Sequence, residues 1–328
     1  MMRRPFSLRV PGAVLALVLG ASGAVACTGD DGKPDIVVTT NILGDVVTRL
    51  VGDTAEVRVL MKPNADPHSF GISAREAGEV ENADLVVANG LGLEEGLGSI
   101  LDSARGEGVD VLEVGELVDP LDYTAGADNG ADNGADNGAD NGADSAEAAK
   151  DPHFWTDPAR MVEATGIIEE KLTDELDGDE ADRVREAAAS YRSELEQLDA
   201  EVAELLGSVP EDNRKLVTNH HVFGYLADRF NYRVIGAVIP GGTTLASPSA
   251  ADLRDLSTTI RDNHVPAVFA DSSQPQRLAE VLAQEAGVDV EVVALFSESL
   301  TEPDGEAGNY IDMQRTNAER ISDALTPR

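Results

Sequence analysis

Two of the five histidines in this 328-residue chain occupy the same tripeptide, Asp-Pro-His, and a third ends an apolar, strand-like run. They are His68, His153 and His220. Imidazole is the side chain that zinc and related metals bind most often in proteins. In a chain so poor in histidine, three of them in such positions indicate a metal site, provided that they converge on one ion.

The two Asp-Pro-His turns are suited to hold an imidazole in place before a metal arrives. Pro67 and Pro152 each lack a backbone donor and fix φ, and each drives the preceding aspartate to an extended conformation. A turn of this kind lowers the ordering cost of metal binding. One Pro-His turn alone is more often an ordinary loop, but two of them together with a strand-end histidine favour a site.

Short β-branched runs alternate with helical patterns along the chain, which is typical of parallel sheets with crossover helices. Four such runs fall in each half, so the sequence predicts an α/β fold of two βα lobes with mainly parallel four-stranded sheets. The strands are expected at residues 35–40, 55–61, 85–88 and 109–114 in the first half, and at 215–218, 232–238, 267–270 and 290–295 in the second.

One long rigid helix is predicted between the two halves. Residues 179–206 contain no proline or glycine, and one apolar face follows three-four spacing: Val184, Ala188, Tyr191, Leu195, Leu198, Val202 and Leu205. At 1.5 Å per residue this helix would be about 40 Å long, enough to run the length of two lobes. The pattern alone also allows a helix that packs on one lobe. The predicted domains are an N-terminal lobe over 27–178, a connecting helix over 179–207 and a C-terminal lobe over 208–328.

The candidate ligands come from both halves of the chain. His68, His220 and Glu298 each follow a predicted strand, and His153 lies in a turn before a helix that begins near Pro158. Open parallel sheets bind ligands outside the carboxyl ends of their strands. The sequence therefore predicts a site between the two lobes.

Two further residues are candidates for a second layer around this site. Asp271 directly follows a predicted strand and could orient the N–H of a metal-binding histidine or interact with a neighbouring cation. His221 is adjacent to His220, and neighbouring side chains at a helix start diverge by about 100°. We therefore expect His221 to lie behind the site or at the surface. His264 precedes a strand and is expected to be a solvated loop residue.

The N-terminus has the features of a secretory signal. Three arginines precede an apolar stretch from about residue 11 to residue 26, which is too short to span a membrane. The stretch ends at Cys27, the single cysteine, in an Ala-Val-Ala-Cys sequence that resembles a bacterial lipobox. We expect residues 1–26 to be a lipoprotein signal peptide and Cys27 to carry the lipid anchor. The mature protein would then work on the outer face of the membrane or in the periplasm. An ordinary cleavable signal is the alternative.

Charge and composition exclude one class of partner. The formal net charge is −36, whereas nucleic-acid binding requires a basic surface. Part of the acidity lies in residues 127–142, which are four copies of Ala-Asp-Asn-Gly. Such turn-forming residues, without apolar side chains larger than alanine, predict a disordered acidic insertion over 124–150.

Segments around the histidines resemble the zinc- and manganese-binding lipoproteins of bacterial ABC importers, the ZnuA/TroA type. The resemblance covers nearly the whole mature chain and is carried by Val38–Leu43, Pro63–Phe70, Asp151–Pro158, Thr218–Leu226 and Asn309–Met313. It implies two βα lobes joined by one long helix, with metal ligands at His68, His153, His220 and Glu298.

The fourth ligand departs from the family pattern. The family usually has aspartate at the position of Glu298, and glutamate is one methylene longer, so its mode of coordination is open. It coordinates with an adjusted backbone, or it leaves the metal with three histidines and a water. Asp304 is a weaker substitute candidate.

Three imidazoles and one carboxylate suit zinc better than manganese, which favours more oxygen ligands. The resemblance implies a monomeric protein without enzymatic activity that captures Zn(II), with Mn(II) as second choice, and delivers it to an ABC permease. A zinc hydrolase with an open three-histidine site is the alternative from another class, although no HExxH motif or partnered general base is found. A surface adhesin is a further alternative, because some relatives are described in that way.

Overall fold

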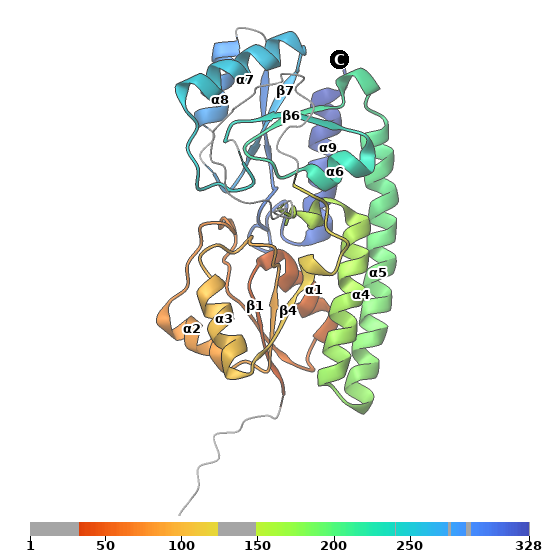
Figure 1. Ribbon diagram of the computed structural model, residues 1–328. Helices are drawn as coiled ribbons and strands as arrows, with labels where there is room; N and C mark the ends of the chain where they lie inside the picture. Colours follow the sequence, from red (N-terminus) through yellow and green to blue (C-terminus); the bar gives the residue numbers. More distant parts are fainter. Residues whose placement is uncertain (1–32, 124–148, 240, 275–276, 287–289, 328) are drawn as a thin grey trace, which may run out of the picture. The chain divides into compact units, whose positions relative to one another are not determined.

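Each half of the chain forms one four-stranded sheet (Figure 1). The computed structural model describes residues 33–123, 149–239, 241–274, 277–286 and 290–327. The N-terminal lobe contains the strands β1 (Asp35–Val38), β2 (Glu56–Val59), β3 (Leu85–Ala88) and β4 (Asp110–Glu113). The C-terminal lobe contains β5 (Lys215–Thr218), β6 (Arg233–Ala237), β7 (Ala267–Asp271) and β8 (Glu291–Leu295).

Both sheets are wound in the same way. Their strand orders are β2-β1-β3-β4 and β6-β5-β7-β8, and the strand pairs within them are parallel. In each lobe the second strand lies on one side of the first strand, and the third and fourth strands lie on the other side. The carboxyl ends of the strands on either side of this change of direction are where open α/β sheets bind ligands. The predicted α/β class with two parallel four-stranded sheets is confirmed.

Helices connect the strands and carry side-chain caps where the sequence supplies them. The helices of the described residues are α1 (Asn41–Val51), α2 (Ala74–Glu81), α3 (Gly98–Glu107), α4 (Pro158–Glu175), α5 (Gly178–Gly207), α6 (Gly224–Phe230), α7 (Ala250–Asp262), α8 (Arg277–Ala286) and α9 (Tyr310–Leu325). Thr40 caps α1 and Asp157 caps α4, because the side-chain oxygen of each accepts a hydrogen bond from a backbone N–H of the first turn. Helix α4 also starts with Pro158, a residue suited to the first helical position.

Helix α5 is the predicted connection between the lobes. Its 30 residues span about 45 Å. It contacts α1 of the N-terminal lobe, α9 of the C-terminal lobe, and α4 along its side (Figure 1). The buried face matches the predicted spacing as far as Val202, after which Leu206 is buried and Leu205 is only partly so. The helix therefore supports both lobes rather than one.

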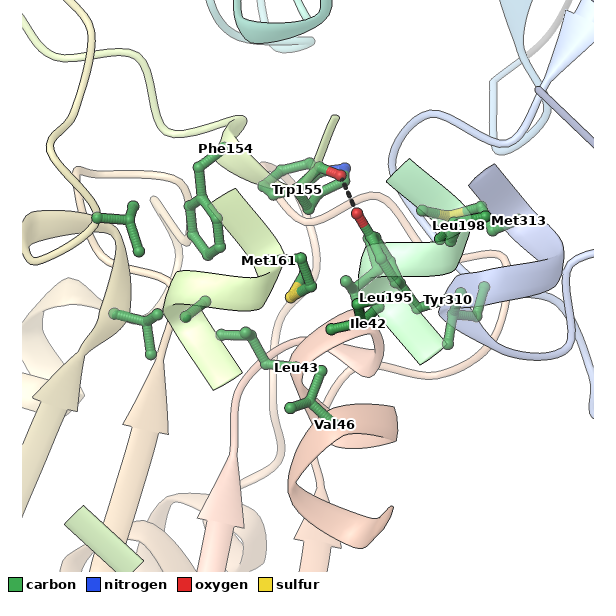
Figure 2. Packing of buried hydrophobic residues seen from close by; sticks show 14 of the residues in the cluster. Ile42, Leu43, Val46, Phe154, Trp155, Met161, Leu195, Leu198, Tyr310 and Met313 are labelled. Carbon is green, nitrogen blue, oxygen red and sulfur yellow. Dashed lines mark hydrogen bonds between the residues drawn. The ribbon is translucent and has the colours of Figure 1, made fainter. Parts of the chain in front are cut away.

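The core continues across both lobes around Trp155. This residue lies in a short 3-10 helix, Phe154–Thr156, and is buried beside Met161, Leu195 and Tyr310 (Figure 2). The Tyr310 hydroxyl donates a hydrogen bond to the Trp155 carbonyl at 2.7 Å, which Figure 2 draws as a dashed line. Residues from α4, α5 and α9 thus fix the segment that immediately follows His153.

Several sequence predictions lie outside the described residues. They are the signal peptide 1–26, the lipid anchor at Cys27 and residues 124–148 of the acidic insertion. The last two residues of that insertion, 149 and 150, are described and make backbone contacts. Tyr123 N donates to Ala149 O at 2.7 Å, and Asp122 forms an antiparallel bridge with Lys150.

The part of the chain that the structure describes has no helix with the length and apolar character to cross a bilayer. From Lys33 onward the chain clusters into a single compact unit. The domain boundaries at 27–178, 179–207 and 208–328 therefore stay a prediction.

Candidate metal centre

Four buried side chains from four separate segments meet at one point. One nitrogen or oxygen from each of His68, His153, His220 and Glu298 lies within 4.8 Å of the other three. His220 Nε2 is 3.2 Å from Glu298 Oε1, and the Nε2 atoms of His68 and His153 are 3.3 Å apart. Donors at zinc-ligand distance from one tetrahedral ion lie about 3.3 Å from each other. The spacing therefore matches the shell of a single cation.

Within the described part of the chain, two members of this group, His220 and Glu298, lack the hydrogen bonds that buried polar atoms normally make. Both oxygens of Glu298 and both ring nitrogens of His220 have no hydrogen-bond partner among the described residues. Glu298 is 1 % exposed and His220 is 0 % exposed. Leaving a carboxylate buried and unpaired is costly, because the protein then supplies nothing in place of its hydration. A bound cation would supply the missing partner for the atoms that face it.

Burial also disfavours the charged forms of His68, His220 and Glu298. Burial, followed by the neighbouring imidazoles, lowers the pKa of His68 to about 3. Burial, followed by His153, lowers the pKa of His220 to about 3, and burial raises the pKa of Glu298 to about 8. At neutral pH these two histidines are therefore deprotonated, as metal binding requires. A divalent cation would favour the charged form of Glu298.

His153 differs from the other two histidines because a carboxylate holds its far side. Asp151 Oδ1 lies 2.7 Å from His153 Nδ1 and also accepts the backbone N–H of His153 at 3.0 Å. Burial lowers the pKa of His153, but Asp151 and then Glu298 outweigh this effect and raise it overall. With Nδ1–H donated to Asp151, the Nε2 lone pair faces the other candidate ligands.

The backbone around Glu298 is held on both sides. On one side, Ser297 O accepts from Trp155 Nε1 at 2.9 Å. On the other, Asn41 Nδ2 donates to Ser299 Oγ at 2.8 Å and Asn41 Oδ1 accepts from Leu300 N at 3.0 Å. Because Asn41 begins α1, the N-terminal lobe helps to orient a glutamate that follows β8. The longer side chain of Glu298 reaches the histidines, with Oε2 placed 3.7 Å from His68 Nε2.

Asp271 and His221, the two residues expected to lie around the ligands, make contacts with residues outside the four-residue group. Asp271 accepts hydrogen bonds from Ser273 and from Ser297, and none from an imidazole among the described residues. The role expected for Asp271 therefore stays a prediction, and the carboxylate that lies against an imidazole ring nitrogen at 2.7 Å is that of Asp151. His221 lies outside the four-residue group, with its ring centroid 6.1 Å from that of Tyr123.

The remaining polar candidates lie away from the group. Asp304 and His264 are both exposed and contribute no atom to it. Sequence reasoning missed the role of Asp151, although the signal was present in the Asp-Pro-His turn. An aspartate two residues before a histidine can bond both the backbone and the ring of that histidine, and only one of the two turns does so.

Comparisons with known proteins agree with this geometry. The sequence model of the family described as ZnuA, zinc-uptake complex component A, periplasmic, matches residues 36–324. The zinc-binding protein TroA of Treponema pallidum is 30% identical over 299 residues, which cover 90% of each chain. The solved structure of the periplasmic zinc-binding protein TroA from Treponema pallidum superposes with a TM-score of 0.79 at 28% identity, over 90% of this chain and all of that one.

Relatives with different metals in their names also match. The manganese-binding lipoprotein MntA of Halalkalibacterium halodurans is 24% identical over 317 residues, covering 95% of this chain and 96% of MntA. The zinc-binding lipoprotein AdcA of Streptococcus pneumoniae R6 is 29% identical over 301 residues, which are 90% of this chain but 57% of AdcA.

Proposed function

The chain belongs to the ZnuA family of periplasmic components of zinc-uptake complexes, and from that premise we propose that it captures Zn(II) outside the cytoplasmic membrane for an ABC importer. Members of the family are metal-binding components of ABC metal uptake and not enzymes. Such components work with a membrane permease and its ATPase. The observation that carries the proposal is the buried group of three imidazoles and one carboxylate that each offer one ligand atom within 4.8 Å of the others.

We assign the metal ligands to His68, His153, His220 and Glu298. Support comes from the four donor atoms, which lie within 4.8 Å of one another, with His220 Nε2 3.2 Å and His153 Nε2 3.9 Å from Glu298 Oε1. Their low exposure excludes water from most of the shell, as in sites where the protein supplies the full set of ligands. A fourth protein ligand also separates this site from a hydrolytic zinc centre, which keeps one position open for water.

The metal that we propose is zinc, with manganese as the second candidate. Three imidazoles and one carboxylate are borderline donors that favour zinc, whereas manganese favours more oxygen ligands. The names of TroA and AdcA refer to zinc and the name of MntA refers to manganese, so relatives of both kinds exist. The donor set of this chain is the argument for zinc.

Titration of metal-free protein tests the assignment directly. We expect stoichiometric zinc binding that outcompetes manganese by at least about a hundredfold, because the site offers three nitrogen donors. His220→Ala removes one donor and is expected to abolish stoichiometric binding. His264→Ala, which changes an exposed histidine outside the group, is the matched control. Tight binding by His220→Ala would refute the ligand assignment, and preference for manganese would refute the choice of metal.

We further propose that the protein is a monomer tethered at Cys27 to the outer face of the membrane. The relatives support a location outside the cytoplasm, since their names describe periplasmic or lipoprotein components. Incorporation of labelled palmitate by the full chain, and its loss in Cys27→Ser, is the expected result. Equal labelling of both would refute the anchor, and elution as a dimer in size-exclusion chromatography would refute the monomer.

A further inference from the structure

The carboxylate of Asp66 connects the two lobes at the edge of the metal centre. It belongs to the first Asp-Pro-His turn and is 8 % exposed. Within its own turn it accepts the backbone N–H of His68 on Oδ1 at 2.9 Å and the hydroxyl of Ser69 on Oδ2 at 2.9 Å. Oδ2 also accepts from Thr244 Oγ1 at 2.5 Å and from Gln274 Nε2 at 2.8 Å.

The donors Thr244 and Gln274 both come from the C-terminal lobe. Thr244 lies in the loop between β6 and α7, and Gln274 lies in the turn after β7. The donors to the Asp66 carboxylate among the described residues are a backbone N–H, two hydroxyls and an amide, so its buried charge is compensated by neutral groups. If the lobes separated, this carboxylate would lose two of four donors and would need water in their place.

The contact continues through the C-terminal lobe to the opposite ligand. Gln274 N donates to the Asp271 carbonyl at 3.3 Å, and Asp271 Oδ2 accepts the backbone N–H of Ser297 at 3.2 Å. Ser297 directly precedes Glu298. A chain of hydrogen bonds thus runs from the backbone of His68, through Asp66 and Asp271, to the residue next to Glu298.

The second Asp-Pro-His turn shows that this arrangement is not a general property of the motif. There the aspartate turns its Oδ1 to the imidazole of its own histidine at 2.7 Å. In the first turn the same position points its carboxylate at the other lobe. Two identical tripeptides are therefore used for different tasks, one to orient a ring and one to join the lobes.

We propose that Asp66 is a positioning residue that locks the two lobes over the bound metal and so controls how fast the metal leaves. The proposal rests on the proposed function, because it concerns release from the same site. Asp66 itself does not coordinate. The lock consists of the two hydrogen bonds that Thr244 and Gln274 of the C-terminal lobe donate to Asp66. When these bonds break, the His68 side of the site opens and the metal can leave.

Two variants break the lock without touching a candidate ligand. Thr244→Val and Gln274→Met remove the two donors and keep side-chain volume close to that of the original. Loss of one hydrogen bond to a buried charge corresponds to about a tenfold change in an equilibrium constant. We expect each variant to release zinc about tenfold faster to the chromophoric chelator 4-(2-pyridylazo)resorcinol, with a smaller change in the association rate.

Controls separate the lock from general damage. Thr244→Ser keeps the hydroxyl and is expected to release zinc like the unchanged protein. Thr259→Val removes a hydroxyl whose hydrogen bond stays within α7, and it is also expected to have no effect. The visible spectrum of the Co(II)-loaded protein should be the same for all variants, since the ligands are unchanged. Release rates within twofold of the unchanged protein for both lock variants would overturn the proposal.

Hydrogen exchange of the metal-free protein distinguishes failure of the lock from failure of the proposed function. The backbone N–H of His68 is bonded to Asp66, so its exchange should accelerate in Thr244→Val. If the unchanged protein binds no zinc but this exchange accelerates, the proposed function falls and the lock between the lobes stands. If zinc binds and neither exchange nor release changes, the lock falls and the proposed function stands.

Discussion

Replacing Asp151 tests how far one buried carboxylate prepares His153 for a metal. Asp151 Oδ1 is 2.7 Å from His153 Nδ1, and His153 is completely buried. Asp151→Asn keeps the shape and one acceptor but removes the negative charge. Changes of this kind behind a metal-binding histidine weaken affinity by about 10- to 100-fold. We expect the lower part of that range, about 1.4 kcal/mol, because the amide oxygen still accepts one hydrogen bond.

The affinity difference between the unchanged protein and Asp151→Asn should change with pH in one direction, which a general loss of stability would not produce. Burial lowers the pKa of His153, but Asp151 and then Glu298 together outweigh this and raise it, so protons compete for this imidazole more strongly than they would without the Asp151 carboxylate. Removing the charge of Asp151 lowers the pKa of His153, so protons compete less with zinc for this imidazole. The advantage of the unchanged protein over Asp151→Asn should therefore be largest at alkaline pH and should begin to shrink above pH 6.5, as the pH falls through the raised pKa of His153.

The assay is zinc titration against a competing chelator at several pH values. Asp122→Asn is the matched control, because it removes a carboxylate that is exposed and pairs with Lys150 instead of an imidazole. The control is expected to bind zinc like the unchanged protein at every pH. An affinity ratio between the unchanged protein and Asp151→Asn that stays constant with pH, or that remains below twofold, would refute the reasoning.

Three further predictions concern stability and packing. Burial raises the pKa of Glu298 to about 8, so the metal-free fold loses stability as the pH rises from the ordinary value of 4.5 towards 8. The free energy of unfolding in urea should therefore rise for Glu298→Gln relative to the unchanged protein over this pH window, by up to about 1.4 kcal/mol per pH unit. A difference that does not change with pH would contradict the burial argument. A Cβ on Gly224 would collide with Asp151 Oδ2, so Gly224→Ala should weaken zinc binding about as much as Asp151→Asn. Gly166→Ala, whose Cβ would meet only the end of an arginine side chain, should leave zinc binding unchanged. Leu195→Ala, on the buried face of α5, should cost about 2–5 kcal/mol and keep a single unfolding transition, and two separate transitions would show that α5 does not couple the lobes.

The fold could be predicted because its signals are local. Each strand is a short β-branched run, and the predicted strands 85–88 and 215–218 match β3 and β5 in full. The prediction of 35–40 runs past the end of β1, because Thr40 caps the next helix instead. Most of helix α5 could be predicted from the three-four spacing of its apolar residues alone. Only packing decides that Leu206 and not Leu205 is buried at its end.

The candidate site could be predicted in part, for a reason that lies in the topology. Strand ends of parallel sheets gather at one edge, so His220 and Glu298 could be placed near each other from sequence. The structure also brings His68 and His153 into the same group, and their role as ligands stays a prediction. The partners of the two aspartates could not be predicted. Thr244 lies in a loop without periodicity, and nothing in the sequence of either Asp-Pro-His turn says where its carboxylate points.

The pairing of Tyr123 with Ala149 has a consequence for how the chain tolerates change in length. These residues close the segment between them just before Asp151, whose own N–H is bonded to Leu121 O at 2.9 Å. Both bonds lie at the ends of the intervening residues, so they set the register of Asp151 and His153 by themselves. We therefore expect a chain with fewer or more repeat units between the paired residues to keep that register.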